Sequence, residues 1–117
     1  MVGEADAATG TCVAHDGDDI DGWVSHGLAI AEIPDSAFWH GALKRQAWIE
    51  SGWTPDIPGM NDGNSAIGQR SMGLEQIIPM AWASTSTGQV YPFSGCWSDP
   101  VISVAVRSEL FWMGWWH

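Results

Sequence analysis

The segment 99–116, DPVISVAVRSELFWMGWW, places the strongest constraint on the fold of this chain. Ser98 or Asp99 can cap a helix there, and Pro100 suits its first position. Apolar residues are distributed nearly all round the helix axis up to Trp116, and a helix with that pattern is usually buried. No apolar run reaches the roughly 18 residues that a membrane span needs. We therefore expect a buried helix that the rest of the chain surrounds.

Length and composition indicate one globular domain. The chain has 117 residues, of which 45% are hydrophobic, and both values are typical of a single folded domain. The formal net charge is −10, from 14 acidic and 4 basic residues. Because contacts with phosphate need clustered Lys and Arg side chains, this balance argues against nucleic-acid binding.

Acidic residues are concentrated in residues 1–21, which contain no Lys or Arg. We expect these residues to form a solvated, mobile N-terminal arm before a domain over residues 22–117. They have neither the basic start nor the apolar middle of a secretory signal, so we expect no signal peptide. Their DGDDIDG stretch does not fit a helix-loop-helix calcium site, because Ile20 and Gly27 occupy two of the ligand positions.

The cysteines leave two alternatives open. Cys12 and Cys96 could form one disulfide that ties the arm to a late loop, or they could be independent thiols. The four histidines show no spacing typical of a zinc site. We therefore expect no metal ion and no cofactor.

Two helices are predicted in the first half of the chain. Residues 22–33 have a helical pattern with Asp21 as a plausible cap. A second helix begins after Asp35 or Ser36 and stops at Gly52, which suits the left-handed conformation that ends many helices. Its apolar residues recur at helical spacing.

The second half is more irregular. Residues 53–70 are rich in Pro, Gly, Asn and Asp, and the Asp-Gly pair within 61–64 favours a hairpin. This predicts a small, irregular two-stranded lobe. Residues 71–78 have the pattern of a short helix, Pro79 opens the next one, and 84–98 are expected to be loop. The overall class is mainly α with a small β lobe.

Glu50 stands apart from the other acids. It lies in the last turn of the predicted second helix, where the helix dipole disfavours an ionised carboxylate. Trp48, Ile49 and Trp53 are near in sequence, so partial desolvation would act in the same direction. The basic pair at 44–45 lies off the i−3 and i−4 positions. These effects favour the protonated form, which a general acid requires, although a surface glutamate at a frayed helix end fits the same residues.

A longer pattern begins at this glutamate. Its parts are ESG at 50–52, DGN at 62–64, Gly68 and SMGLEQIIP at 71–79. The pattern resembles the soluble lytic transglycosylase family of goose-type-lysozyme-like domains, and most closely the variant found in phage tail tape-measure proteins and cell-wall hydrolases. That variant reads E-S-x-G-N-P, then D-S-N, a glycine, and S-x-G-L-M-Q-x-I. The positions that match it at the same distance from the glutamate are Pro55, Asp62, Asn64, Gly68, Ser71, Gly73, Leu74 and Gln76. The likeness covers about residues 22–115.

The resemblance implies a lysozyme-like α+β fold, in which a helical bundle carries a small hairpin lobe. It implies cleavage of the β-1,4 bond between N-acetylmuramic acid and N-acetylglucosamine in peptidoglycan. In that family a single glutamate protonates the leaving oxygen and then takes a proton from the sugar's own 6-hydroxyl, which leaves a 1,6-anhydro end. Glu50 matches that glutamate. The resemblance places Ser51, Gly73, Leu74 and Gln76 around the acid and the sugar, and Asp62 and Asn64 in a structural turn.

The resemblance also implies partners and a location. The partner is the glycan strand of peptidoglycan, together with other phage tail or virion proteins if the chain is a tail component. Delivery with a virion, or release as an endolysin, would bring the protein to the host cell wall or periplasm without a signal peptide.

Three positions depart from the family pattern. Glu75 replaces the methionine of GLMQ, where a second carboxylate could favour the protonated form of Glu50, position a water for hydrolysis, or face solvent. Glu109 and Leu110 stand where the family carries an Arg-Tyr pair, and the single tyrosine, Tyr91, is a candidate substitute. These departures support a second interpretation, a catalytically weak or inactive glycan-binding or structural module of the same fold. A helical interaction protein without a glycan role is supported only by the helices.

Nine tryptophans are present. Aromatic faces stack on sugar rings, and Trp53 or Trp82 could do so at the cleft. Large apolar residues more often pack in the core. We assign four of them to packing, namely Trp23, Trp39, Trp112 and Trp115.

Overall fold

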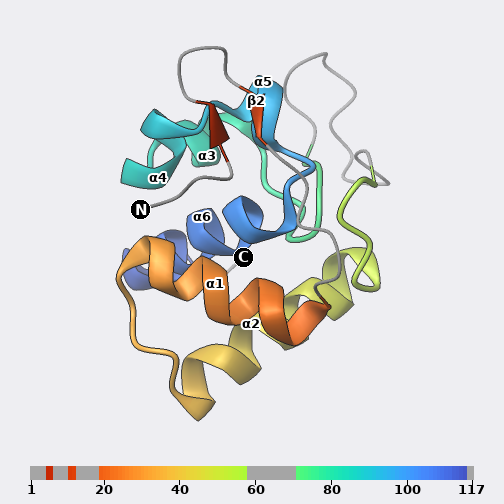
Figure 1. Ribbon diagram of the computed structural model, residues 1–117, viewed down its shortest axis with the longest axis vertical. Helices are drawn as coiled ribbons and strands as arrows, with labels where there is room; N and C mark the ends of the chain where they lie inside the picture. The colour runs from red at the N-terminus through yellow and green to blue at the C-terminus, as the bar shows by residue number, and fades with distance from the viewer. Residues whose placement is uncertain (1–4, 7–10, 13–18, 58–70, 116–117) are drawn as a thin grey trace.

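Helices make up most of the computed structural model, which describes residues 5–6, 11–12, 19–57 and 71–115 (Figure 1). The helices in these residues are α1 (Ile20–Ala31), α2 (Ala37–Ser51), α3 (Pro79–Ala83), α4 (Ser86–Val90), α5 (Phe93–Cys96) and α6 (Pro100–Trp112). Two short strands, β1 (Ala5–Asp6) and β2 (Thr11–Cys12), pair antiparallel. The mainly helical class is confirmed. Most of the predicted hairpin lobe, with Asp62 and Asn64, lies outside the described residues.

The central element is α6, as the sequence predicts. The Asp99 side chain caps it by accepting hydrogen bonds from the backbone N–H groups of Val101 at 2.9 Å and Ile102 at 3.1 Å, and Pro100 occupies the first turn. Nearly every residue from Pro100 to Phe111 is buried. The helix ends at Trp112, earlier than predicted, and Trp112 is exposed.

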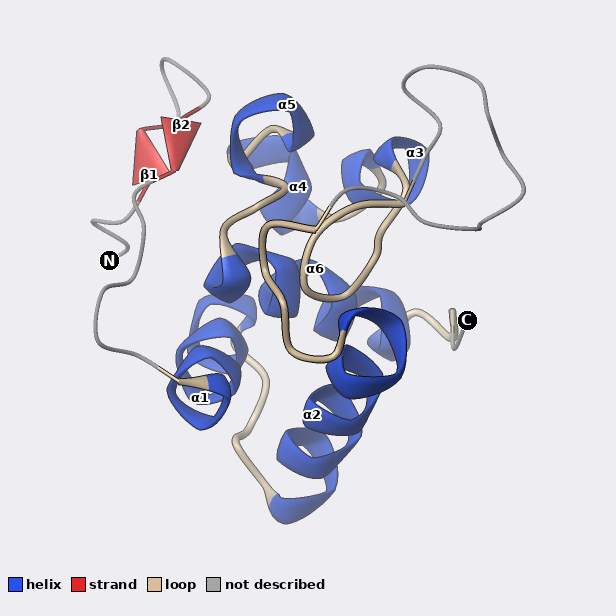
Figure 2. Cartoon of the chain, turned by 90° about the vertical axis from the view of Figure 1, so that its right-hand side faces the viewer, coloured by secondary structure: helices blue, strands red, loops and turns tan. Residues whose placement is uncertain are grey.

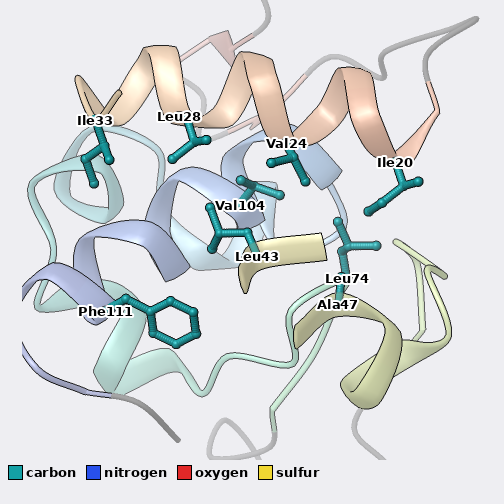
Figure 3. Packing of buried hydrophobic residues seen from close by; sticks show 9 residues of the cluster. All are labelled: Ile20, Val24, Leu28, Ile33, Leu43, Ala47, Leu74, Val104 and Phe111. Carbon is teal, nitrogen blue, oxygen red and sulfur yellow. The ribbon is translucent and has the colours of Figure 1, made fainter. Parts of the chain in front are cut away.

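Two hydrophobic clusters lie on opposite sides of α6, with α1 and α2 on one side and α3, α4 and α5 on the other (Figures 1 and 2). The first cluster joins α1, α2 and Leu74 to Val104 and Phe111 of α6 (Figure 3). The second joins α3 and α5 to a row of α6 residues spaced four apart, so one helix supplies both cores. The row is Ile102, Val106 and Leu110.

A glycine allows α1 and α6 to pack closely. A Cβ atom added to Gly27 would lie 2.6 Å from the Cβ of Val104 and 2.8 Å from the carbonyl oxygen of Val101. Real side chains do not approach so closely, so a larger residue at this position would push the two helices apart.

The boundaries of the first two helices are set by their caps. Asp19, not Asp21, accepts a hydrogen bond from the backbone N–H of Gly22 at 3.1 Å, so the predicted Asp21 cap is wrong and α1 begins at Ile20. Instead, the Asp21 carboxylate accepts hydrogen bonds from side chains of α2.

The second helix agrees with its prediction. Ser36 caps α2 by accepting from the backbone N–H of Trp39 at 3.2 Å. Gly52 ends the helix with φ +61°, in the left-handed region that glycine adopts without strain. The core-facing residues of α2 are Leu43 and Ala47.

The predicted helix over 71–78 is wrong. The backbones of Met72 and Ile77 exchange hydrogen bonds of 3.2 and 3.1 Å, which closes a four-residue turn between them. Gly73 has φ +85° and Gln76 has φ +50°. Both angles lie outside the right-handed helical region, so the helix cannot form.

The predicted loop over 84–98 is also wrong, because it contains α4 and α5. Thr85 caps α4 by accepting from the backbone N–H of Gly88 at 2.8 Å, and Pro92 precedes α5. Helices of five and four residues are too short to show an apolar period in sequence.

A disulfide joins Cys12 of β2 to Cys96 of α5, with a Cα–Cα distance of 5.1 Å. It decides between the two alternatives that the sequence leaves open. Most of the predicted mobile arm, residues 1–21, lies outside the described residues. Within the described stretches, no helix is both long and apolar enough to span a membrane.

Candidate functional site

The end of α2 presents Glu50 to solvent. Leu43 and Ala47 anchor this helix in the first cluster, which leaves Glu50 and its neighbours Trp48 and Ile49 on the outer surface. The apolar enclosure that we expected around Glu50 from these neighbours is therefore absent. What surrounds the carboxylate comes from other segments.

Glu50 lines a pocket of about 270 Å³. The wall is formed by residues from the 72–77 turn and its continuation into α3, from α6, and from the residues after α6. They are Gln76, Ile77, Ile78, Ala81, Arg107, Leu110 and Trp115. Segments that are distant in sequence thus meet at one acidic side chain.

One hydrogen bond orients the Glu50 carboxylate. The Nε2 amide of Gln46 donates to Glu50 Oε2 at 2.9 Å. The two residues are four apart on α2, which is the spacing that places side chains on one helix face. Sequence analysis assigned no role to Gln46, although this spacing was the available signal.

Ser51 braces the helix end and does not contact the acid. Its hydroxyl donates to the carbonyl oxygens of Ala47 at 3.0 Å and Leu74 at 2.6 Å, and accepts from the backbone N–H of Thr54 at 3.1 Å. The contact with Leu74 fixes the end of α2 against the 72–77 turn.

That turn is held by contacts to Gly73. A Cβ atom at Gly73 would lie 2.2 Å from the carbonyl oxygen of Trp97, so only glycine fits there. The backbone N–H of Gly73 donates to the carbonyl oxygen of Ile57 at 2.9 Å. Leu74 is fully buried in the first cluster and does not line the pocket. Gly73 and Leu74 therefore hold the turn in place and do not themselves line the pocket.

Gln76 and Ile77 are the members of this turn that line the pocket, and Gln76 is the polar one. Its Nε2 amide donates to the carbonyl oxygens of Gly73 at 3.0 Å and Ile57 at 3.3 Å. Its Oε1 atom accepts from the hydroxyl of Ser71 at 3.4 Å. These bonds hold the amide in one orientation at the wall.

Glu75 is fully buried, and neither carboxyl oxygen has a hydrogen-bond partner among the described residues. Its backbone is fixed by α6, because its N–H donates to Ser103 Oγ at 3.1 Å and its carbonyl oxygen accepts from Arg107 Nη2 at 2.7 Å. Desolvation raises the pKa of Glu75 to about 8; the charge of Arg107 opposes this rise and that of Glu50 adds to it. The solvent-facing alternative for Glu75 is wrong. Nor does the side chain line the pocket, so it is not placed to position a water there.

Arg107 was not identified from sequence. Its side chain is 4% exposed and forms part of the pocket wall. Nη2 donates to the carbonyl oxygens of Glu75 and, at 3.3 Å, Gln76. The guanidinium lies 5.6 Å from the ring centre of Phe111, and its buried Nε has no hydrogen-bond partner in the described part of the chain.

Two other predicted residues lie away from the pocket. Tyr91 packs against the second cluster and accepts a hydrogen bond from Trp82 Nε1 through its carbonyl oxygen. Trp53 donates from its indole nitrogen to the carbonyl oxygen of Lys44 at 3.0 Å and packs edge-on against Trp48. Neither lines the Glu50 pocket.

The burial of the tryptophans agrees only in part with the prediction. Trp82 is fully buried, so its predicted contact with sugar is wrong. Trp23 and Trp39 pack against the first cluster as expected. Trp112 is 68% exposed and Trp115 is 46% exposed, so their assignment to the core is wrong.

A larger cavity, of about 570 Å³, lies elsewhere on the molecule, where the end of α1, the start of α4 and the end of α6 meet. Its wall includes Glu32, Glu109 and Trp112. The Glu109 carboxylate accepts hydrogen bonds from the backbone N–H groups of Ser86 at 2.8 Å and Thr87 at 2.9 Å. Glu109 therefore caps α4.

Comparison with known proteins adds no relative. No family model, curated protein or solved structure matches the chain. In the described residues, no group of three or more His, Cys, Asp and Glu side chains is arranged to hold a metal ion.

Proposed function

We propose that the chain is a peptidoglycan lytic transglycosylase or muramidase that uses Glu50 as its single catalytic carboxyl group. The observation that supports this most directly is the pocket, which brings Glu50 together with Gln76 of the motif and Leu110 of the closing helix. These are the segments that the family resemblance names. A lysozyme-like arrangement with a hairpin lobe is part of the same proposal.

The proposed reaction requires one proton donor that later acts as a base. Protonated Glu50 gives its proton to the glycosidic oxygen as the bond from C1 to that oxygen breaks. The carboxylate then takes the proton of the 6-hydroxyl as O6 bonds to C1, which yields a 1,6-anhydro sugar. The Glu50 side chain is exposed and lines the pocket, and Gln46 orients it, so a glycan strand in the pocket could contact it.

A turbidity assay on purified peptidoglycan tests this proposal. Glu50→Gln should lower the clearing rate by about a hundredfold or more, because positioned acid catalysis contributes roughly that much. Glu32→Gln is the matched control, since Glu32 is an exposed glutamate that does not line the Glu50 pocket. Equal clearing by wild type and Glu50→Gln would exclude Glu50 as the acid. Mass spectrometry then distinguishes 1,6-anhydro ends from hydrolysed ends.

A catalytically weak or inactive glycan-binding module is the second candidate. It is favoured by Leu110, an apolar side chain in the pocket wall at the position where the family carries tyrosine. This candidate predicts no clearing, together with quenching of tryptophan fluorescence by chito-oligosaccharides.

The proposed setting follows from the substrate. The partner is the glycan strand of peptidoglycan, which the protein meets in the host cell wall or periplasm as part of a virion or phage tail, or as an endolysin. Co-sedimentation with purified cell walls tests whether the protein binds the glycan strand of peptidoglycan.

A further inference from the structure

Arg107 is a buried cation without a counter-ion in hydrogen-bond contact. Its hydrogen bonds in the described residues all come from Nη2 and end on backbone carbonyl oxygens, which are neutral. Nε has no partner. Burying a charge is costly unless it is paired and hydrogen-bonded. Glu75 and Glu50 are near enough to interact with Arg107 through their charges, yet no carboxylate of the described residues accepts a hydrogen bond from it.

The nearest candidate counter-ion does not complete it. Glu75 lies on the turn whose backbone Arg107 binds, yet its carboxyl oxygens accept no hydrogen bond from the described part of the chain. Because desolvation raises the pKa of Glu75 to about 8, this carboxyl group is mainly protonated at pH 7. Glu50 lines the same pocket, but as a general acid it must also be protonated before the reaction.

Accordingly, we propose that Arg107 binds a carboxylate of the glycan substrate in the Glu50 pocket, and that the enzyme prefers strands with free carboxylates to neutral strands. This inference rests on the proposed function, since it names the group that the same pocket recognises. In peptide-free strands, N-acetylmuramic acid carries such a group on its 3-O-lactyl ether. The group is an amide where a stem peptide is attached, and a strand of N-acetylglucosamine alone lacks it.

Guanidinium and carboxylate groups match in shape and charge. The planar guanidinium presents parallel N–H donors, and its bonds to carboxylates are among the strongest that side chains form. Phe111 packs on Arg107 and the two backbone carbonyls hold Nη2, so the donor geometry is set before the ligand arrives.

The test uses two substrates that differ only in charge. Peptide-free glycan strands with free lactyl carboxylates are compared with the same strands after the carboxylates are converted to amides. Binding to the Glu50→Gln protein is followed by tryptophan fluorescence, and cleavage is followed with wild type. We expect the amidated strands to bind at least about tenfold more weakly, as for the loss of one charge-assisted pair.

Variants then assign the preference to one residue. Arg107→Gln should bind both substrates equally, and Arg107→Lys should keep part of the preference. Arg45→Gln is the matched control, because Arg45 is an exposed arginine on α2 and should leave the preference unchanged. Equal binding of the two substrates to the Glu50→Gln protein would overturn the proposal, and so would an unchanged preference in Arg107→Gln.

The two proposals fail in different ways. If Glu50→Gln cleaves peptidoglycan as wild type does, the proposed catalytic role fails, while the binding comparison still tests Arg107. If Arg107→Gln does not fold, as circular dichroism would show, the comparison of the two substrates with Arg107 intact still decides whether a carboxylate is recognised.

Discussion

Two acidic side chains, Glu109 on α6 and Glu75 packed against it, have opposite environments. Glu109 accepts hydrogen bonds from the backbone N–H groups of Ser86 and Thr87 and from the Thr87 hydroxyl. Its carboxylate is therefore stabilised by donors within the fold. Glu75 is completely buried and accepts no side-chain hydrogen bond from the described residues. Glu109 belongs to the larger cavity, of about 570 Å³, whereas Glu75 lies beside Arg107 behind the smaller pocket.

This difference supports the smaller pocket as the proposed site, although the other cavity has the larger volume. In the larger cavity the acid stabilises a short helix and has little capacity left for a ligand. At the smaller pocket, the buried Nε of Arg107 has no hydrogen-bond partner among the described residues, and Glu50 is an exposed residue of the wall. Burying a charge is costly, and Arg107 is buried near enough to Glu50 for their charges to interact.

The largest expected effect concerns the pH dependence of stability. Glu75 has its pKa raised from 4.5 to about 8 in the folded protein, so its contribution is fully present below pH 4.5 and is lost as pH rises through about 8. Between these limits wild type should lose on the order of 5 kcal/mol of unfolding free energy relative to Glu75→Gln. Urea denaturation of both proteins across this range measures the difference.

The control for that experiment is Glu32→Gln, which removes an exposed glutamate and should follow the wild-type curve. If wild type and Glu75→Gln show parallel pH dependences, Glu75 is ionised in the folded protein at neutral pH. It would then neutralise Arg107, and the contrast with Glu109 would disappear.

A smaller effect is expected for Glu109→Gln. The amide cannot replace all the bonds that the carboxylate accepts at the start of α4, so the free energy of unfolding should fall by about 1.5 to 3 kcal/mol. Peptidoglycan clearing per folded molecule should remain at the wild-type level, because Glu109 does not line the Glu50 pocket. A loss of clearing without a loss of stability would assign the larger cavity to the reaction.

The parts of the fold that sequence predicted are those with local causes. The second helix and α6 are bounded by their own caps, Ser36 and Asp99, and by Gly52. The 72–77 turn was missed because it depends on Gly73 lying against the backbone of Trp97, a contact between segments far apart in the chain. The residue pattern within 71–78 does not indicate that contact.

The residues of the candidate site also differ in whether the sequence could identify them. Glu50 and Gln76 could be named because they belong to one spaced motif, and both line the pocket. Trp115 was missed because the segment after α6 reaches this wall only through the tertiary fold. Arg107 left a usable signal, since a lone cation in a helix expected to be buried must have a partner or a function.

The smallest expected effect is on glycan binding, and a pair of tryptophans, one in each cavity, tests which cavity binds the glycan. Trp115 lines the Glu50 pocket and Trp112 lines the larger cavity. Trp115→Ala should weaken binding of peptide-free glycan strands by about threefold to tenfold, because it removes an aromatic face from the wall. Trp112→Ala should leave binding unchanged, although loss of its stacking on Trp39 should lower stability slightly. Fluorescence titration of both variants in the Glu50→Gln background measures this, and a larger loss for Trp112→Ala would place the glycan at the Glu109 cavity instead.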